Sequence, residues 1–245
     1  MFTDSMSSNE LLDEYHSDLP YIQERAYRFD ESDYVNKYLY KRRKQSCVVI
    51  TRPLKTPRGN RYLGIFIYVK SGNTKFTERW EFSSFHVGFM NTFKGITAIA
   101  FYADSKQALI FTPHFFRRYK ERMLKVCDWS LRNALNEAKT IEDLVGIYVK
   151  RNLGTTWIET ESEFGDKVHI FAPVNDGVAL LQWNKGKQLL QANTFVTNDM
   201  LNDKQLQMVE YAKTYFRLTN EERRKYKLPD FISGDESNKN NNLSK

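Results

Sequence analysis

The stretch Gln107–Arg122, QALIFTPHFFRRYKER, marks the point where the chain passes from a strand into a helix. The apolar residues before Thr112 predict a short strand, and Pro113 suits the first position of a helix that Thr112 can cap. Strands are predicted before this stretch, and helices followed by strands after it. The expected fold class is therefore α+β, with antiparallel sheets and flanking helices.

A helix beginning at Pro113 would carry two different stripes. Residues four apart lie on one side, which places His114, Arg118 and Arg122 in one row. Phe115, Tyr119 and Met123 form the neighbouring apolar row. An imidazole can move a proton near neutral pH, and guanidinium groups hold phosphate oxygens. The first stripe therefore suits a site that handles phosphate, with Arg117 and Lys120 as further cations for nucleic acid.

The same spacing also fits an ordinary surface helix. Charged stripes are common on amphipathic helices, where water solvates the basic face. Glu121 and Lys125 would then form a simple helix pair. Spacing alone does not choose between this reading and the phosphate site.

The segment 1–45 is predicted to be helical. One helix begins near Ser8, and a second covers Asp30–Lys44 with Asp30 or Ser32 as its cap. This helix ends in four consecutive cations, Lys41, Arg42, Arg43 and Lys44. They either complement the negative end of the helix dipole or form a patch that binds nucleic-acid phosphates.

The region 46–112 is predicted to be rich in strands. The expected strands are 47–51, 62–70, 75–82, 95–102 and 107–112, with a loop over 53–60 and hairpin turns at 71–73 and 104–106. His86 follows the third strand, next to an expected bend, and is read there as a hydrogen-bonded structural residue.

The segment 113–232 is predicted to contain a helix pair, a four-stranded antiparallel meander and a C-terminal helix. Helical patterns begin at Asp128 and at Thr140, and the strands are 156–161, 167–172, 178–183 and 188–196. Short turn signals separate these strands, so neighbours should pair antiparallel. A helix over 198–217 and a short one over 220–226 follow, and the polar tail 233–245 is expected to be disordered.

Composition narrows the function classes. The 245 residues carry a formal net charge of +7, which favours polyanionic partners. Cys47 and Cys127 have no CxxC partner, so a zinc cluster is not expected. The protein is expected to lie in the reducing cytoplasm. No apolar run is long enough to cross a membrane. Phosphate-binding glycine loops and metal-ligand spacings are also missing, so neither a cofactor nor a metal is expected.

The order of these features resembles the superfamily of small ribonucleases that includes barnase, EndoU, the colicin ribonucleases and RelE-like toxins. The matching features are a helix with His114, Arg118 and Arg122, a second helical segment, and a meander whose last strand carries Thr194 in Ala192–Val196. The resemblance covers residues 112–197. It implies metal-independent cleavage of RNA, with an antitoxin or regulatory protein as partner.

Such cleavage uses the 2′-hydroxyl of the RNA as nucleophile. The protein must supply a base, an acid and cations for the charged phosphorane. In this reading His114 moves a proton, Arg118 and Arg122 clamp the phosphate, and Thr194 bonds a phosphate oxygen or the 2′-hydroxyl. No second acid or base stands out. Two other classes therefore remain open, a non-catalytic nucleic-acid-binding or accessory protein and a structural α+β protein that binds other proteins.

Overall fold

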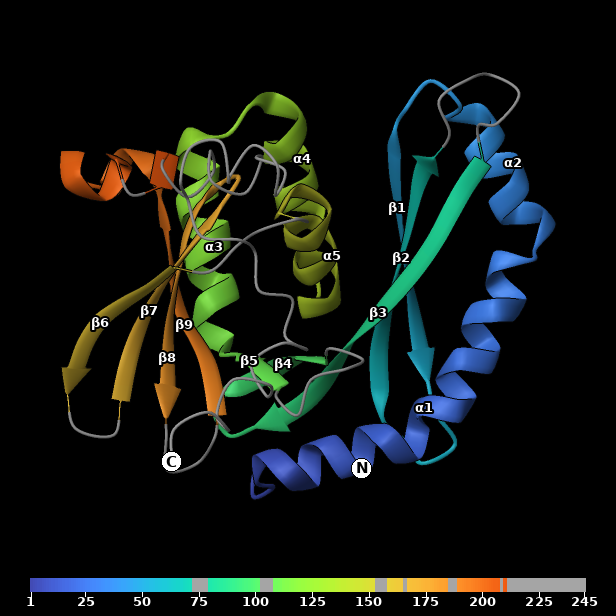
Figure 1. Cartoon of the computed structure of the whole chain (residues 1–245), viewed down its shortest axis with the longest axis horizontal. Coiled ribbons are helices and arrows are strands. Elements are labelled where there is room, and N and C mark those ends of the chain that lie inside the picture. Colours follow the sequence, from blue (N-terminus) through green and yellow to red (C-terminus); the bar gives the residue numbers. More distant parts are fainter. Residues whose placement is uncertain are drawn as a thin grey trace, which may run out of the picture. The chain divides into compact units, whose positions relative to one another are not determined.

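A sheet of nine strands forms the centre of the unit Met1–Met200. The computed structural model describes residues 1–71, 79–101, 108–152, 158–164, 167–184, 189–207 and 209–210. Its strands are β1 (Cys47–Lys55), β2 (Arg61–Ser71), β3 (Arg79–Thr92), β4 (Gly95–Phe101), β5 (Ala108–Phe111), β6 (Ile158–Phe164), β7 (Lys167–Val174), β8 (Gly177–Asn184) and β9 (Leu189–Thr197). They lie in the order β1-β2-β3-β4-β5-β9-β8-β7-β6 (Figure 1).

All neighbouring strands are antiparallel except β5 and β9, which pair in parallel through Leu109–Phe111 and Leu190–Ala192. This one parallel pair joins the strands before residue 112 to the later meander. The α+β class with a largely antiparallel sheet is thus confirmed, and the strands before and after residue 112 belong to one sheet.

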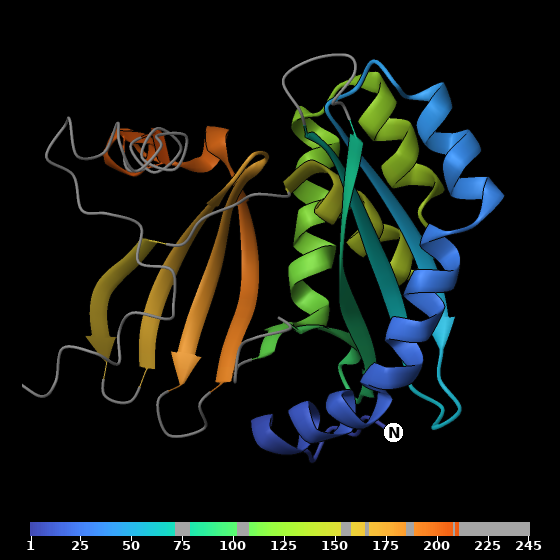
Figure 2. The same cartoon turned by 45° about the vertical axis from the view of Figure 1, so that its right-hand side comes forward.

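Two helices precede the sheet and three lie between β5 and β6. They are α1 (Ser8–Asp30), α2 (Asp33–Lys41), α3 (Pro113–Val126), α4 (Trp129–Glu137) and α5 (Ile141–Asn152). The last three begin where the sequence predicts helices, at Pro113, after Asp128 and after Thr140. Pro20 lies inside α1 and has no N–H for the helical ladder, which accounts for the bend of α1 in Figure 2.

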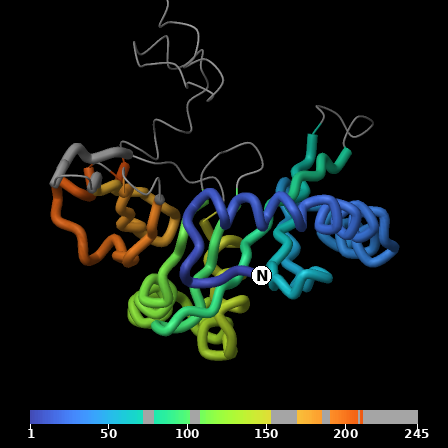
Figure 3. The backbone as a smooth tube through the Cα atoms, turned by 90° about the horizontal axis from the view of Figure 1, so that it is seen from below, coloured from blue at the N-terminus to red at the C-terminus, as the bar shows by residue number. Residues whose placement is uncertain are grey.

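The helices cover both faces of the sheet. The largest apolar cluster packs α3, α4 and α5 on one face, with Phe115, Leu135 and Val145 almost completely buried. On the other face, α1 packs on β2 to β5 through Leu11 and Tyr15, and α2 packs on β1 and β2. Figure 3 shows α1 on one side of the strands and α3 with α4 on the other.

Two strands are longer than predicted. β1 continues through Pro53 to Lys55, so the predicted loop over 53–60 shrinks to a tight turn in which the Thr56 N–H donates to the Asn60 carbonyl. Pro53 is accepted because β1 is an edge strand. β3 runs to Thr92, so His86 lies within a strand and not at a bend.

Helix boundaries differ in three places. α1 extends to Asp30, so Ser32 alone caps α2. The Ser32 side chain accepts from the Val35 N–H. After β9 the chain forms a 3-10 turn over Asn198–Met200. The next helical residues begin at 203, with the Asn202 side chain accepting from the Gln205 N–H at 3.0 Å. The predicted turns at 72–73 and 104–106, the helix beyond 210, the helix 220–226 and the tail 233–245 lie outside the described residues.

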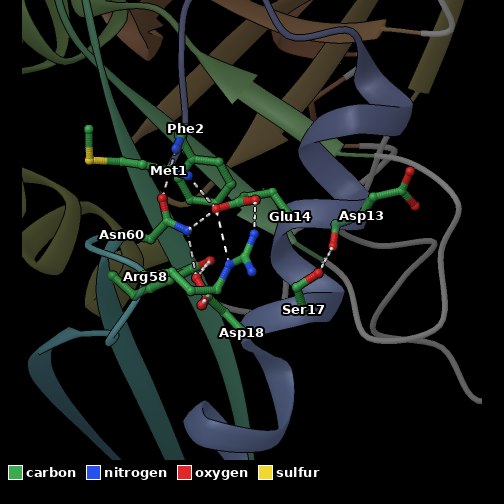
Figure 4. A network of polar contacts seen from close by, with 9 residues as sticks. Met1, Phe2, Asp13, Glu14, Ser17, Asp18, Arg58 and Asn60 are labelled. Carbon is green, nitrogen blue, oxygen red and sulfur yellow. Dashed lines mark hydrogen bonds and ion pairs between the residues drawn. The ribbon is translucent and has the colours of Figure 1, made fainter.

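A buried polar network fastens α1 to the turn between β1 and β2 (Figure 4). Glu14 accepts from Arg58 at 2.6 Å and from Asn60 at 2.8 Å. The Asn60 side chain also donates to Asp18, which is 1% exposed, at 2.6 Å. Two carboxylates on one helix thus bind the amide and guanidinium of one turn, which sets the position of α1 on the sheet.

The predicted boundary at residue 45 lies just before β1, the first strand of the sheet. The predicted boundary at residue 112 lies between β5 and α3, and strands on both sides of it belong to the same sheet. Residues from Leu201 onward form a second unit. Among the described residues, no helix is long and apolar enough to cross a membrane.

Candidate phosphate-binding site

Helix α3 is held firmly at its N-terminus. Thr112 caps it by accepting from the Phe115 N–H at 3.3 Å, and its hydroxyl lies 3.3 Å from the carbonyls of Ala192 and Asn193 in β9. Pro113 occupies the first turn as predicted. The predicted apolar stripe is confirmed, since Phe115, Tyr119 and Met123 are at most 4% exposed.

The first turns of α3 gather polar groups on the opposite, solvent-facing side. Arg117 Nη2 lies 2.8 Å from His114 Nδ1, and Arg118 Nε lies 3.3 Å from His114 Nε2. Arg118 also donates to Glu121 at 2.9 Å. The helix carries five Lys and Arg residues against this one carboxylate.

The two contacts of His114 compete with each other. A neutral imidazole has one accepting nitrogen and one N–H, so only one of the two guanidinium groups can donate to it. The other guanidinium group then faces the N–H of the ring, which cannot accept a hydrogen bond. Desolvation and then the charges of Arg118 and Arg117 lower the pKa of His114, which keeps the ring neutral at pH 7. An anion placed here would accept hydrogen bonds from the ring N–H and from the guanidinium that lacks an acceptor.

Two other predicted residues are engaged elsewhere. Arg122 donates to the carbonyl of Phe195 in β9. Lys120 donates to the Ala138 carbonyl at the end of α4, at 3.1 Å. Both contacts hold α3 in place. The donors on α3 that can still bind an anion are therefore those of His114, Arg117 and Arg118.

Thr194 is not brought to this stripe. Phe195 is fully buried beneath α3 and packs on Phe115 and Tyr119. Thr194 precedes it in an extended strand, so its side chain points to the other face of the sheet. The register agrees, since Phe195 pairs with Ala179 of the core under α3 and Thr194 pairs with Leu180.

The four cations at the end of α2, Lys41–Lys44, form a separate group. Arg42 stacks its guanidinium 3.6 Å from the centre of the Tyr38 ring, and Arg43 lies 4.8 Å from that of Tyr40. α2 ends at Lys41, which places the basic end at the negative end of the helix dipole, as one reading predicted. Because α2 packs on the opposite face of the sheet from α3, the two predicted basic groups do not form one surface.

A buried network missed by the sequence reading lies behind α3. Tyr119 donates to Asp176 at 2.8 Å, and Arg151 binds the same carboxylate through Nε and Nη2 at 2.6–2.9 Å. Burial, together with the nearby Asp176 carboxylate, raises the pKa of Tyr119 well above its usual value. Tyr119 is therefore a structural residue. Asp176 lies in a turn signal, and nothing in the sequence pairs it with Tyr119.

Within the described ranges no three His, Cys, Asp or Glu side chains gather as metal ligands would. Comparisons with models of protein families, with curated proteins and with solved structures give no match for this chain.

Proposed function

We propose that this protein binds nucleic acid by its phosphate backbone, through the first turns of α3. The observation that carries the proposal is the meeting of His114, Arg117 and Arg118 within 2.8–3.3 Å, where two guanidinium groups share one imidazole with a single accepting nitrogen. A phosphate oxygen would supply the missing acceptor. Arginine is well suited to this role because its planar fork bonds two oxygens at once.

The setting of the three donors favours a long, flexible anion over a small one. Arg117 is exposed, and Arg118 is 43% exposed, so both reach outward from a rigid helix. The net charge of +7 adds long-range attraction for a polyanion. Glu121 holds Arg118 in place without neutralising Arg117.

The test is a salt titration of binding. Fluorescence anisotropy of a labelled single-stranded RNA, with EDTA present, is measured for the wild type and for Arg117→Gln/Arg118→Gln. Loss of two phosphate contacts should weaken binding and lower the slope of log K against log salt by about 1.4. A labelled DNA of the same sequence shows whether the 2′-hydroxyl matters.

The matched control is Lys37→Gln/Arg79→Gln, which removes two exposed charges away from α3. It should leave the slope nearly unchanged. Equal losses in both double variants would mean that net charge alone attracts the RNA, and the proposed site would then be wrong.

Cleavage of the bound RNA is a second proposal for the same site. A neutral His114 beside two arginines suits a base that takes the 2′-hydroxyl proton while cations hold the phosphate. The test follows the fate of the same labelled RNA on a gel, in EDTA. Cleavage that His114→Ala abolishes, with RNA binding retained, supports it, and intact RNA after long incubation with wild-type protein rejects it. With Thr194 on the other face, Thr194→Ala should change neither binding nor cleavage.

A further inference from the structure

A third group of cations lies beneath α1, on the face of the sheet opposite to α3. Arg52, Gly64 and His86 are direct cross-strand neighbours in β1, β2 and β3. They share the face that α1 covers, because Val48 and Ile50 of β1 and Phe66 of β2 pack against that helix. Gly64 has no side chain, and the Phe66 ring lies over it, since a Cβ on Gly64 would be 2.9 Å from Phe66 Cε2.

Arg52, Gly64 and His86 line a cavity of about 230 Å³ between α1 and the sheet. Four basic side chains line it, namely Arg25, Arg28, Arg52 and Lys55. None of its lining residues is an aspartate or glutamate. Arg28 binds Glu24, but the described residues offer no carboxylate partner to the other three.

Two of the three remaining cations, Arg25 and Arg52, are held in place by aromatic groups. The Nε of Arg25 donates to the Tyr21 hydroxyl at 3.2 Å, and the guanidinium of Arg52 lies 4.9 Å from the centre of the Phe29 ring. Such contacts orient a guanidinium without neutralising it. The cavity therefore keeps its positive charge.

His86 forms the buried wall of this cavity. It is 4% exposed, and its Nε2 has no hydrogen-bond partner among the described residues. Its Nδ1 lies 3.4 Å from the Tyr15 hydroxyl. Burial raises the pKa of Tyr15 to about 12 and lowers that of His86 to about 4, so both groups are neutral at pH 7. In the tautomer in which Tyr15 donates to Nδ1, Nε2 carries the proton and is a buried donor in need of an acceptor.

We propose that this cavity binds the phosphate group of a small phosphomonoester, between Arg52, Lys55 and the Nε2–H of His86. A phosphate dianion carries several accepting oxygens and about two negative charges near neutral pH, which matches two or three cations and one neutral donor. The apolar part of the lining, from Ile22, Phe29, Leu54 and Phe66, suits the carbon body of such an ester. This site is separate from α3 and is independent of the function proposed above.

The cavity volume argues for a monoester over a polymer. The volume is close to that of a small ligand, and a strand of nucleic acid would have to enter and leave a space that α1 lines on one side. A terminal phosphate can enter end-on.

The experiment follows the His86 ring by NMR during titration at pH 7. Three probes are used on the full chain, inorganic phosphate, a nucleoside 5′-monophosphate, and a dinucleotide whose only phosphate is a diester. We expect saturable shifts of the His86 signals with the first two, and much weaker binding of the diester. Arg52→Gln should weaken phosphate binding by roughly tenfold or more, because it removes a charge-assisted hydrogen bond.

His86→Phe should also weaken binding, since it keeps a ring of similar size but removes the donor; phosphate binding is then followed on the neighbouring backbone amides. If this variant does not fold, Arg25→Gln/Lys55→Gln tests the same site through exposed side chains. The matched control is Arg79→Gln, an exposed arginine that binds Glu81 on the same strand as His86.

The outcomes separate the two sites. Arg117→Gln/Arg118→Gln should leave phosphate binding at His86 unchanged, whatever it does to RNA binding. Absence of a saturable shift at His86 would overturn the proposal, as would equal weakening by Arg52→Gln and Arg79→Gln. Equal affinity for the diester would overturn the assignment to a monoester.

Discussion

Asp176 shows how one residue can support several elements at once. It accepts hydrogen bonds from Tyr119 of α3 and from Arg151 and Asn152 of α5, and it is 9% exposed. In Asp176→Ala the buried Tyr119 hydroxyl and the Asn152 amide would lose this acceptor. We expect the free energy of unfolding to fall by about 3 kcal/mol, measured by urea denaturation.

Tyr119→Phe is the control for that prediction. It removes one hydroxyl and leaves the Arg151–Asp176 pair intact, so a loss of only about 1 kcal/mol is expected. If Asp176→Ala lowers the free energy of unfolding by a similarly small amount, water replaces the carboxylate easily. The network would then not stabilise the packing of α3 against α5.

His114 provides a second prediction at the scale of one residue. Desolvation and neighbouring arginines lower its pKa below the usual 6.5 in the free protein. A bound phosphate stabilises the protonated ring, so saturating RNA should raise this pKa. NMR titration of His114, with and without RNA, measures the change. An unchanged or lower pKa with RNA bound would place the phosphates elsewhere.

At the scale of elements, the docking of α1 should depend on pH. The hydrogen bond from Arg58 is the largest cause that lowers the pKa of Glu14, from its ordinary 4.5 to about 2. The folded carboxylate therefore releases its proton at lower pH than the unfolded one. Its contribution to stability is complete above about pH 4.5 and disappears as the pH falls toward 2.

Glu14→Gln isolates this contribution. The variant should be less stable than the wild type at pH 6, and the difference should shrink steadily between pH 4.5 and 2 in denaturation experiments. Arg58 is half exposed, so solvent screening keeps the effect modest. A difference that stays constant with pH would assign the loss to packing instead of charge.

The elements themselves were predictable where the signals are local. Thr112, Ser32 and Asp128 each cap a helix as their sequence positions suggested, because a cap bonds residues two or three positions away. The turn at Gly177 is also readable from the glycine itself, whose φ of +156° is rarely adopted by residues with a side chain.

Long-range pairing was not predictable from these signals. β3 extends to Thr92 because β2 and β4 both pair with it. The local sequence pattern does not indicate this pairing, so the end of β3 was not predicted. The same limit applies to the candidate sites. The basic stripe on α3 was readable from its spacing, but the orientation of Thr194 and the alignment of Arg52, Gly64 and His86 depend on strand register.

At the scale of the whole unit Met1–Met200, the parallel pair β5–β9 decides whether the sheet behaves as one structure. The apolar cluster under α3 includes Leu63 of β2 and Ile170 of β7, on either side of that pair. A core shared in this way should unfold cooperatively. The two halves of the sheet each carry a tryptophan, Trp80 in β3 and Trp183 in β8.

Phe195→Ala tests this cooperativity. Phe195 is 0% exposed and contacts Phe115, Tyr119 and Tyr148, so its truncation should cost about 3–5 kcal/mol. Denaturation is followed in two variants that retain only Trp80 or only Trp183. Because both reporters share one core, each should show the same midpoint, and Phe195→Ala should lower both midpoints equally. Thr194→Ala, on the other face of β9, should lower them far less. A shift confined to the Trp183 reporter would show instead that the meander unfolds independently of the strands before it.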